Sequence, residues 1–189
     1  IGEWPYGYTS FTFELTDKIK FGSENILSVR LENLPESSRY YTGAGLYRGV
    51  RLVILNPVHV AHWGTFVTTP VVSVDKAIVD VRTNVCVRTK QKGKIKLVTE
   101  ILDQEGKKVA KAISTSHQAD SIFYHQKLQM KSPHLWSVSS PYLYSVLSKV
   151  FVDGKMADCY LTTMGIRSID FDTNKGFLLN GQPFKLKGV

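Results

Sequence analysis

The fold of this chain is decided by one stretch, Ala77-Ile-Val-Asp-Val-Arg-Thr-Asn-Val-Cys-Val-Arg88. Apolar and polar side chains alternate along it. The apolar set is Val79, Val81, Val85 and Val87, and the polar set is Asp80, Arg82, Asn84 and Arg88. Because successive side chains of an extended chain point to opposite sides, this pattern predicts a β-strand with one face in a core and one toward solvent.

Similar segments recur on both sides of this stretch, separated by turn residues. The predicted strands are Val58–Val67 (broken near Gly64), Ala77–Arg88, Lys94–Leu102, Lys107–Ser114, Ser121–Met130, Tyr142–Val152 and Lys155–Met164. Seven short strands at regular spacing over about 100 residues are typical of an immunoglobulin-like β-sandwich.

Residues 1–57 carry the same alternation in three segments, Thr9–Leu15, Asn25–Glu32 and Leu46–Leu55. Three or so strands do not bury two sheet faces by themselves. We therefore expect residues 1–57 to be part of a second sandwich, with its other strands outside the chain.

A hairpin turn is predicted at Asp153-Gly154, and a second near the end of the chain, where Asn180-Gly181 separates two apolar runs. A type I′ turn needs positive φ at both central residues, and Asn-Gly supplies it. The second run, Phe184–Val189, reads as a strand with an open edge, which finished domains avoid. We expect the protein to continue beyond Val189.

Three clusters of motifs resemble glycoside hydrolase family 2, in the order in which that family carries them. The clusters are Trp4–Phe11 with Ser37–Val50, then Leu135–Tyr144, then Gly165–Arg167 with Phe177–Val189. The family includes β-galactosidases, β-glucuronidases and β-mannosidases, and Ser37–Val50 resembles the β-galactosidase branch most. Trp136 of the second cluster is expected to close one end of the core.

The resemblance implies an all-β chain, an immunoglobulin-like β-sandwich preceded by part of a jelly-roll sandwich. It assigns 1–57 to the end of a sugar-binding jelly roll, 58–165 to the immunoglobulin-like domain, and 166–189 to the entry into a TIM barrel that the chain lacks. The parent would be a retaining hydrolase of terminal non-reducing β-galactosides. These domains would hold a sugar-binding loop against the barrel, and the fragment alone would be inactive.

Two alternatives stay open at this point. The parent could be a β-glucuronidase or β-mannosidase of the same family. The chain could instead be a stand-alone carbohydrate-binding or adhesive module. In either case the chain would bind a carbohydrate, and in the full enzyme it would also contact the missing barrel. The oligomeric state is open. A location in the bacterial periplasm or in the cytoplasm would suit the chain equally.

No catalytic residue is predicted within the chain. Retaining glycosidases use two carboxyl groups about 5–5.5 Å apart. Six of the sixteen acidic residues, considered as such a pair, fall on sandwich strands or at turns: Asp80, Glu100, Asp103, Glu105, Asp153 and Asp172. His59 and His62 are three apart and should face opposite sides of a strand, so we expect no shared metal and no cofactor.

Arg39 and Tyr40 are the candidate substrate-binding residues. Aromatic rings stack on the apolar faces of sugars, and guanidinium groups donate to hydroxyls. In the family that the motifs resemble, the loop at Ser37–Tyr41 points toward the active site. The alternative is that Tyr40 and Tyr41 only pack the loop against its surroundings.

The formal net charge is +8 at pH 7, but the lysines are scattered along the sequence. This favours a solvated surface over a nucleic-acid site, which needs basic residues on one face. No apolar run approaches the ~20 residues that span a bilayer. The two cysteines, Cys86 and Cys159, lack the spacing of a metal site.

Overall fold

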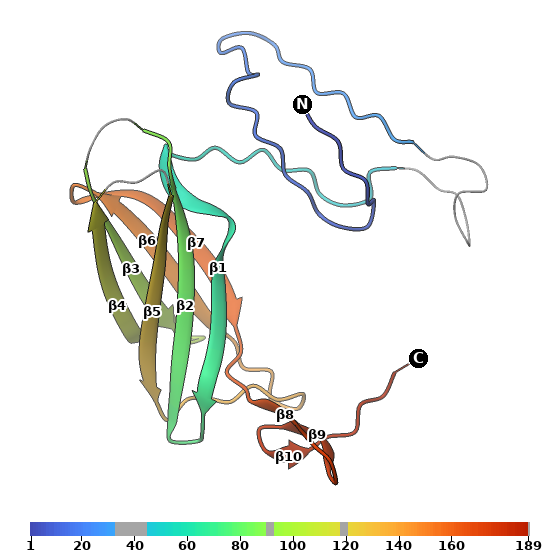
Figure 1. Cartoon of the computed structure of the whole chain (residues 1–189), viewed down its shortest axis with the longest axis vertical. Coiled ribbons are helices and arrows are strands. Elements are labelled where there is room, and N and C mark those ends of the chain that lie inside the picture. The colour runs from blue at the N-terminus through green and yellow to red at the C-terminus, as the bar shows by residue number, and fades with distance from the viewer. Residues whose placement is uncertain (33–44, 90–92, 118–120, 189) are drawn as a thin grey trace. The chain divides into compact units, whose positions relative to one another are not determined.

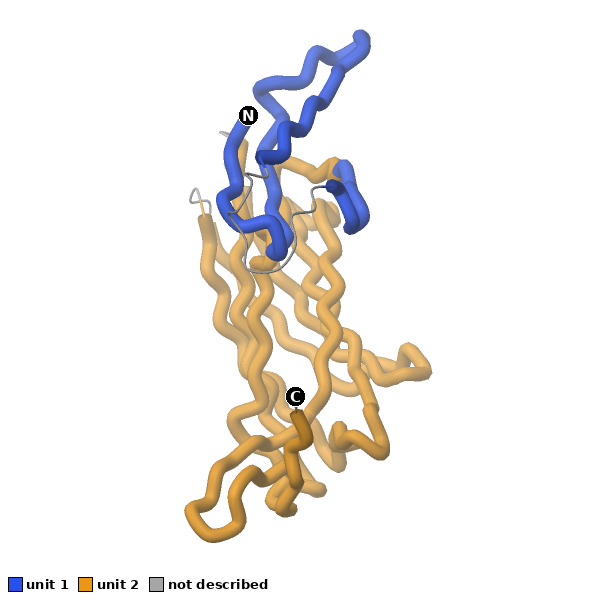
Figure 2. The backbone as a smooth tube through the Cα atoms, turned by 90° about the vertical axis from the view of Figure 1, so that its right-hand side faces the viewer, with its two compact units in different colours: residues 1–52 blue, residues 53–189 orange. Residues whose placement is uncertain are grey.

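The computed structural model describes residues 1–32, 45–89, 93–117 and 121–188. The chain divides into two compact units, Ile1–Leu52 and Val53–Val189, shown in blue and orange in Figure 2.

The second unit is built on two antiparallel sheets (Figure 1). The strands of the first sheet are, in order, β1 (Val58–Val72), β2 (Lys76–Val87) and β5 (Ser121–Lys131). Those of the second are β4 (Lys108–His117), β3 (Lys94–Leu102), β6 (Tyr144–Val152) and β7 (Lys155–Met164). The described residues contain no helix, so the predicted all-β sandwich is confirmed.

The core lies between the inner faces of the two sheets. The valines of β2 that share the predicted apolar face, Val79, Val81 and Val85, have no exposed surface. Equally buried residues on the second sheet include Leu97 and Ile101 of β3. Burying a side chain of this size stabilises the fold by about 1.5–3 kcal/mol, so these alternating positions account for the sandwich.

Strand β1 is longer than predicted, because its pairing with β2 continues to Val72, and the expected break near Gly64 is a register shift inside the strand. The pairing with β2 shifts between Val60 and Thr65. A Cβ at Gly64 would lie 2.7 Å from the Ala61 carbonyl oxygen, so the backbone there passes too closely for any side chain. Trp63 beside it has a φ of 52°, unusual for a bulky residue.

Both predicted hairpin turns have the expected backbone. Asp153 and Gly154 have φ of 46° and 84°, and Asn180 and Gly181 have φ of 50° and 74°. Positive φ at both central residues is the type I′ geometry.

A small third sheet contains β8 (Ile169–Asp172), β9 (Gly176–Leu179) and β10 (Gln182–Pro183), in the order β10-β9-β8. Strand β8 was not predicted from the sequence. The predicted strand at Phe184–Val189 is absent over its described residues, where the Phe184 N–H donates to the Phe177 carbonyl at 2.9 Å and no further pairing follows.

The strand segments predicted in residues 1–57 are not formed in the first unit, because none of its described residues lies in a strand. Its aromatic side chains contact one another locally, as where Trp4 and Phe11 stack with ring centroids 5.9 Å apart. Leu27 and Val29, expected on one buried face, are 57% and 51% exposed. An alternating pattern becomes a strand only where another segment completes its hydrogen-bond ladder, and no described segment of this unit does so.

Candidate functional site

The predicted sugar-binding residues, Arg39 and Tyr40, lie outside the described residues, as does Tyr41. Their role therefore stays a prediction. Three features of the described chain bear on function: a groove, a network of contacts around Trp136 beside the groove, and two charged clusters on the sandwich.

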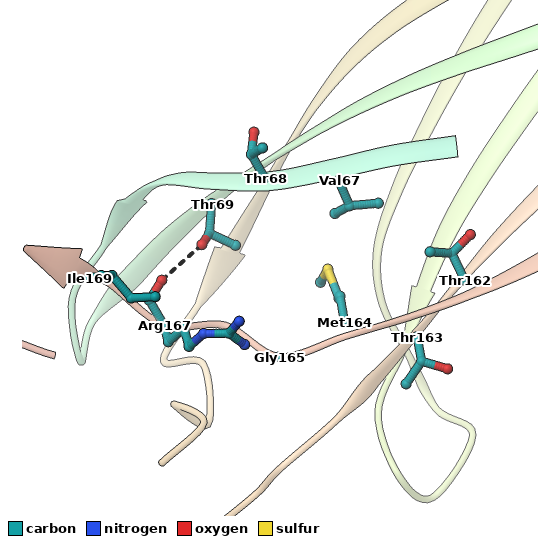
Figure 3. A pocket seen from close by; sticks show the side chains of 9 residues that line it. All are labelled: Val67, Thr68, Thr69, Thr162, Thr163, Met164, Gly165, Arg167 and Ile169. Carbon is teal, nitrogen blue, oxygen red and sulfur yellow. Dashed lines mark hydrogen bonds between the residues drawn. The ribbon is translucent and has the colours of Figure 1, made fainter. Parts of the chain in front are cut away.

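The groove has a volume of about 440 Å³ and lies where β1 and β7 form neighbouring edges of the two sheets (Figure 3). Its lining residues are Val67, Thr68, Thr69, Thr162, Thr163, Met164, Gly165, Arg167 and Ile169. Threonine hydroxyls and one guanidinium give it hydrogen-bonding groups but no carboxylate, so the groove offers no group for glycoside hydrolysis.

A network of contacts beside the groove, which shares Thr69, Gly165 and Arg167 with the groove lining, holds the chain where it leaves β7. The Thr69 hydroxyl donates to the Arg167 carbonyl at 3.0 Å, as Figure 3 shows. The Arg167 guanidinium carbon lies 4.9 Å from the centroid of the Trp136 ring. The backbone N–H of Trp136 donates to the carbonyl of Ile166, a fully buried residue, at 2.8 Å.

Asn180 ties the C-terminal hairpin to the same place. Its side-chain oxygen accepts from the Ser168 N–H at 3.0 Å, and its side-chain amide donates to the Trp136 carbonyl at 3.0 Å. Its backbone N–H donates to the Ser168 carbonyl at 2.9 Å. We call Trp136, residues 165–168 and Asn180 the Trp136 junction.

Trp136 itself is half-buried and rests on Gly165, whose Cα faces the indole side chain. The residues that pack against the core at this end are Leu135 and Tyr142. Asn180 was predicted only for its turn conformation; its side-chain bonds depend on contacts 12 and 44 residues away, which no local pattern shows.

Glu100 on β3 is surrounded by lysines. Its carboxylate lies 2.7 Å from the Lys149 ammonium, 3.5 Å from that of Lys108 and 3.7 Å from that of Lys111. The hydrogen bond from Lys149 is the main cause that lowers the pKa of Glu100, against the opposing effect of burial. A glycosidase acid needs a raised pKa, so Glu100 has the wrong environment for that role.

Asp80 on β2 was predicted to face solvent but is buried, because neighbouring side chains cover it. Both of its oxygens lie 2.7 Å from His125 Nε2, and Arg82 Nε lies 3.8 Å away. Asp80 and Glu100 are on the outer faces of different sheets, with the core between them. They are not the convergent carboxylate pair that retaining hydrolysis requires.

The two histidines expected on opposite sides of a strand have separate surroundings. His59 is buried, with Nδ1 2.7 Å from the Asn56 carbonyl oxygen, whereas His62 stacks on Trp63 at 4.6 Å. Among the described residues, no three His, Cys, Asp or Glu side chains are grouped closely enough to hold a metal ion. The same part of the chain has no long apolar helix that could cross a membrane.

Comparisons with known proteins point to one family. The β-galactosidase BoGH2A of Bacteroides ovatus is 36% identical over 192 residues, covering 100% of this chain and 23% of the relative. A β-glucuronidase of Bacteroides fragilis is 32% identical over 205 residues, covering 100% of this chain and 29% of the relative. The chain therefore spans less than a third of the length of these relatives.

The crystal structure of a glycosyl hydrolase family 2 member from Bacteroides cellulosilyticus has a TM-score of 0.68 and 39% identity, covering 71% of this chain and 19% of that one. The sequence signature of the glycosyl hydrolases family 2 matches residues 58–167, which contain all seven strands of the sandwich. The chain belongs to glycosyl hydrolases family 2.

Proposed function

We propose that this chain is a non-catalytic part of a retaining glycosidase that hydrolyses terminal non-reducing β-galactosides. The observation that carries the proposal is the 36% identity to a β-galactosidase across the whole chain. A retaining glycosidase forms a covalent glycosyl-enzyme through one carboxylate and uses a second as acid and base. In this proposal both come from a catalytic barrel elsewhere in the protein.

The proposed division of labour follows the chain. Residues 1–57 would be the end of a jelly-roll domain carrying Arg39 and Tyr40, residues 58–165 the immunoglobulin-like sandwich, and 166–189 the approach to the barrel. The sandwich would act as a spacer of fixed geometry. A displacement of about 1 Å at a substrate-positioning group can cost ~100-fold in rate, so a rigid spacer has a direct catalytic consequence.

The Trp136 junction supports the role of a spacer. It ties the segment after β7 to the sandwich by hydrogen bonds from Thr69 and Trp136 and to the hairpin by those of Asn180. Three separate parts of the sequence thus converge on the point where the chain leaves the sandwich. Such a network restricts the directions in which the following segment can run.

A β-glucuronidase is the second candidate, because the relative from Bacteroides fragilis is 32% identical across the same residues. The substrates of the two candidates differ in the group at C5 of the sugar, which is a carboxylate only in a glucuronide, and in the configuration of the hydroxyl at C4. The sandwich has no site that distinguishes them among its described residues.

The test is to measure kcat/KM of the full-length protein on 4-nitrophenyl β-D-galactoside, β-D-glucuronide and β-D-mannoside. The galactoside should give the highest value. A highest value on the glucuronide or mannoside would replace the galactosidase proposal with that activity. If the full-length protein cleaves none of them but residues 1–189 bind free sugar, the chain is a binding module.

Arg39→Ala in the full-length protein should lower kcat/KM by roughly 10- to 100-fold, the value of one hydrogen bond from a charged donor. Arg30→Ala is the matched control, since exposed Arg30 pairs with Glu32 at 2.6 Å. Equal kcat/KM in Arg39→Ala and the unmodified enzyme would show that Arg39 does not contact substrate.

A further inference from the structure

The outer face of the four-stranded sheet carries a concentration of positive charge. On β3 the inward residues Leu97 and Ile101 are buried, so Lys96 and Glu100 point outward. Lys111 of β4 lies directly across the ladder from Glu100, and Lys149 of β6 lies across from Val98. Lys108 adds a third ammonium group within 4 Å of the Glu100 carboxylate, beside those of Lys111 and Lys149. We call Lys96, Glu100, Lys108, Lys111 and Lys149 the lysine face.

The Glu100 carboxylate offsets one of the three ammonium groups around it, and Asp153 lines the same shallow pocket as Lys96. The ammonium groups of Lys149, Lys108 and Lys111 are 2.7, 3.5 and 3.7 Å from Glu100. Their side chains are 30%, 51% and 42% exposed, so they remain accessible to a ligand. A surface of one sign attracts and concentrates ligands of the opposite sign.

Two of the lysines are held in place before any ligand arrives. Lys149 is hydrogen-bonded to Glu100, and this bond raises the pKa of Lys149 and keeps it protonated. The Lys96 ammonium lies 4.6 Å from the centroid of the Phe151 ring, directly across the ladder. A lysine already restrained loses less side-chain entropy when it binds.

We propose that the lysine face binds an acidic polysaccharide, a glycan that carries carboxylate or sulfate groups. Charge complementarity selects a polyanion. Single-stranded nucleic acids also need exposed rings on which bases stack, and on this face the Phe151 ring is covered by Lys96. Ile113 and Leu161 are exposed on the same face and offer aliphatic contact to sugar rings.

The inference goes beyond the proposed hydrolysis, because it concerns binding by residues 1–189 alone. The probe is polygalacturonate, titrated calorimetrically between about 50 and 200 mM salt, with a neutral glucan and single-stranded DNA as comparison ligands. Polygalacturonate should bind with an affinity that falls as salt rises, and the neutral glucan should not bind.

Two sets of variants locate the surface. Lys111→Glu with Lys149→Glu should lower the affinity by about tenfold or more, because each reversal replaces an attraction with a repulsion. The control is the double variant Lys127→Glu with Lys131→Glu, which changes the net charge by the same amount. Both of its positions are exposed on β5, in the other sheet, so it should have little effect on the affinity. Glu100→Gln should tighten binding by about threefold, since it removes the only carboxylate in the cluster.

Circular dichroism and the melting temperature establish that each variant is folded. Lys111→Ala serves as a milder variant if the double reversal unfolds, because the Lys111 ammonium, at 3.7 Å, is the most distant of the three that pair with Glu100. Equal losses in the two lysine pairs would overturn the proposal in favour of diffuse attraction to the whole chain. Equal or tighter binding of single-stranded DNA would overturn the choice of a glycan.

Discussion

Gly165 shows how a single residue sets the geometry of the junction. A Cβ built on Gly165 would lie 2.9 Å from three atoms of the Trp136 side chain, closer than unstrained carbon atoms approach. The backbone after β7 can therefore run against the indole only because this position has no side chain.

Gly165→Ala should lower the free energy of unfolding by about 1–3 kcal/mol, the usual cost of overpacking. Urea unfolding followed by Trp fluorescence measures it. Gly49→Ala is the control, because a Cβ there would meet no atom within 4 Å. An equal stability of both variants would show that Trp136 moves aside at no cost.

Glu100 makes stability depend on pH. Its folded-state pKa is lowered from 4.5, mainly by the hydrogen bond from Lys149. Its contribution to stability is therefore fully present above the unfolded pKa and is lost as the pH falls through the lower folded value. Because Lys108 and Lys111 are exposed and screened by solvent, the contribution is modest.

Glu100→Gln should lower the free energy of unfolding by about 1 kcal/mol at pH 7, and the difference from the unmodified chain should shrink below pH 4. Urea unfolding across this pH range tests the expectation. Glu105→Gln, in an exposed turn, should change little at any pH. A constant difference for Glu100→Gln would mean that its carboxylate charge is not what stabilises the fold.

At the scale of the elements, the two sheets are joined by more than apolar contact. Tyr124 on β5 is buried, and its hydroxyl donates to the Ile95 carbonyl of β3, in the other sheet, at 3.2 Å. Burial raises the pKa of Tyr124 and keeps the hydroxyl protonated as a donor. This bond fixes the position of one sheet on the other at the end of the core.

Tyr124→Phe should cost about 1–2 kcal/mol of unfolding free energy, since the ring is kept and one buried hydrogen bond is lost. Tyr160→Phe provides the comparison, as half-buried Tyr160 packs against the same core cluster. Thermal unfolding of both variants measures the difference. If Tyr124→Phe is as stable as the unmodified chain, the bond to Ile95 adds nothing to apolar packing.

For the whole molecule, the contrast lies between its two units. The second unit has two apolar clusters enclosed by two sheets. The described part of the first unit has no strand, and many of its large apolar side chains are exposed. Local stability follows buried apolar contact and protected backbone hydrogen bonds, so the units should open at different free energies.

Amide hydrogen exchange should show fast exchange over residues 1–52 and slow exchange in β2, β3 and β6. The described residues of the first unit serve as the test region, and the central strands serve as the internal standard. Equal protection in both units would contradict the expected difference and would indicate a ladder in residues 1–52.

Much of the sandwich could be predicted because the pattern that predicts each strand or turn lies within a short stretch of the sequence. The alternation of valines in Ala77–Arg88 predicts both the strand β2 and the face that it buries. Asn180-Gly181 likewise predicts its own positive φ values. In both cases the side chains concerned are neighbours in sequence, so a short window holds the whole pattern.

The sequence by itself thus determined the all-β class, seven strands, two turns and, through its motifs, the family. Only the tertiary structure decided that β8 exists, that Asp80 is covered by His125, and that three lysines meet at Glu100. It also decided where Asn180 binds, 44 residues from Trp136. The physical reason is that these features depend on contacts between distant segments, which form only once sheet order and register place them together.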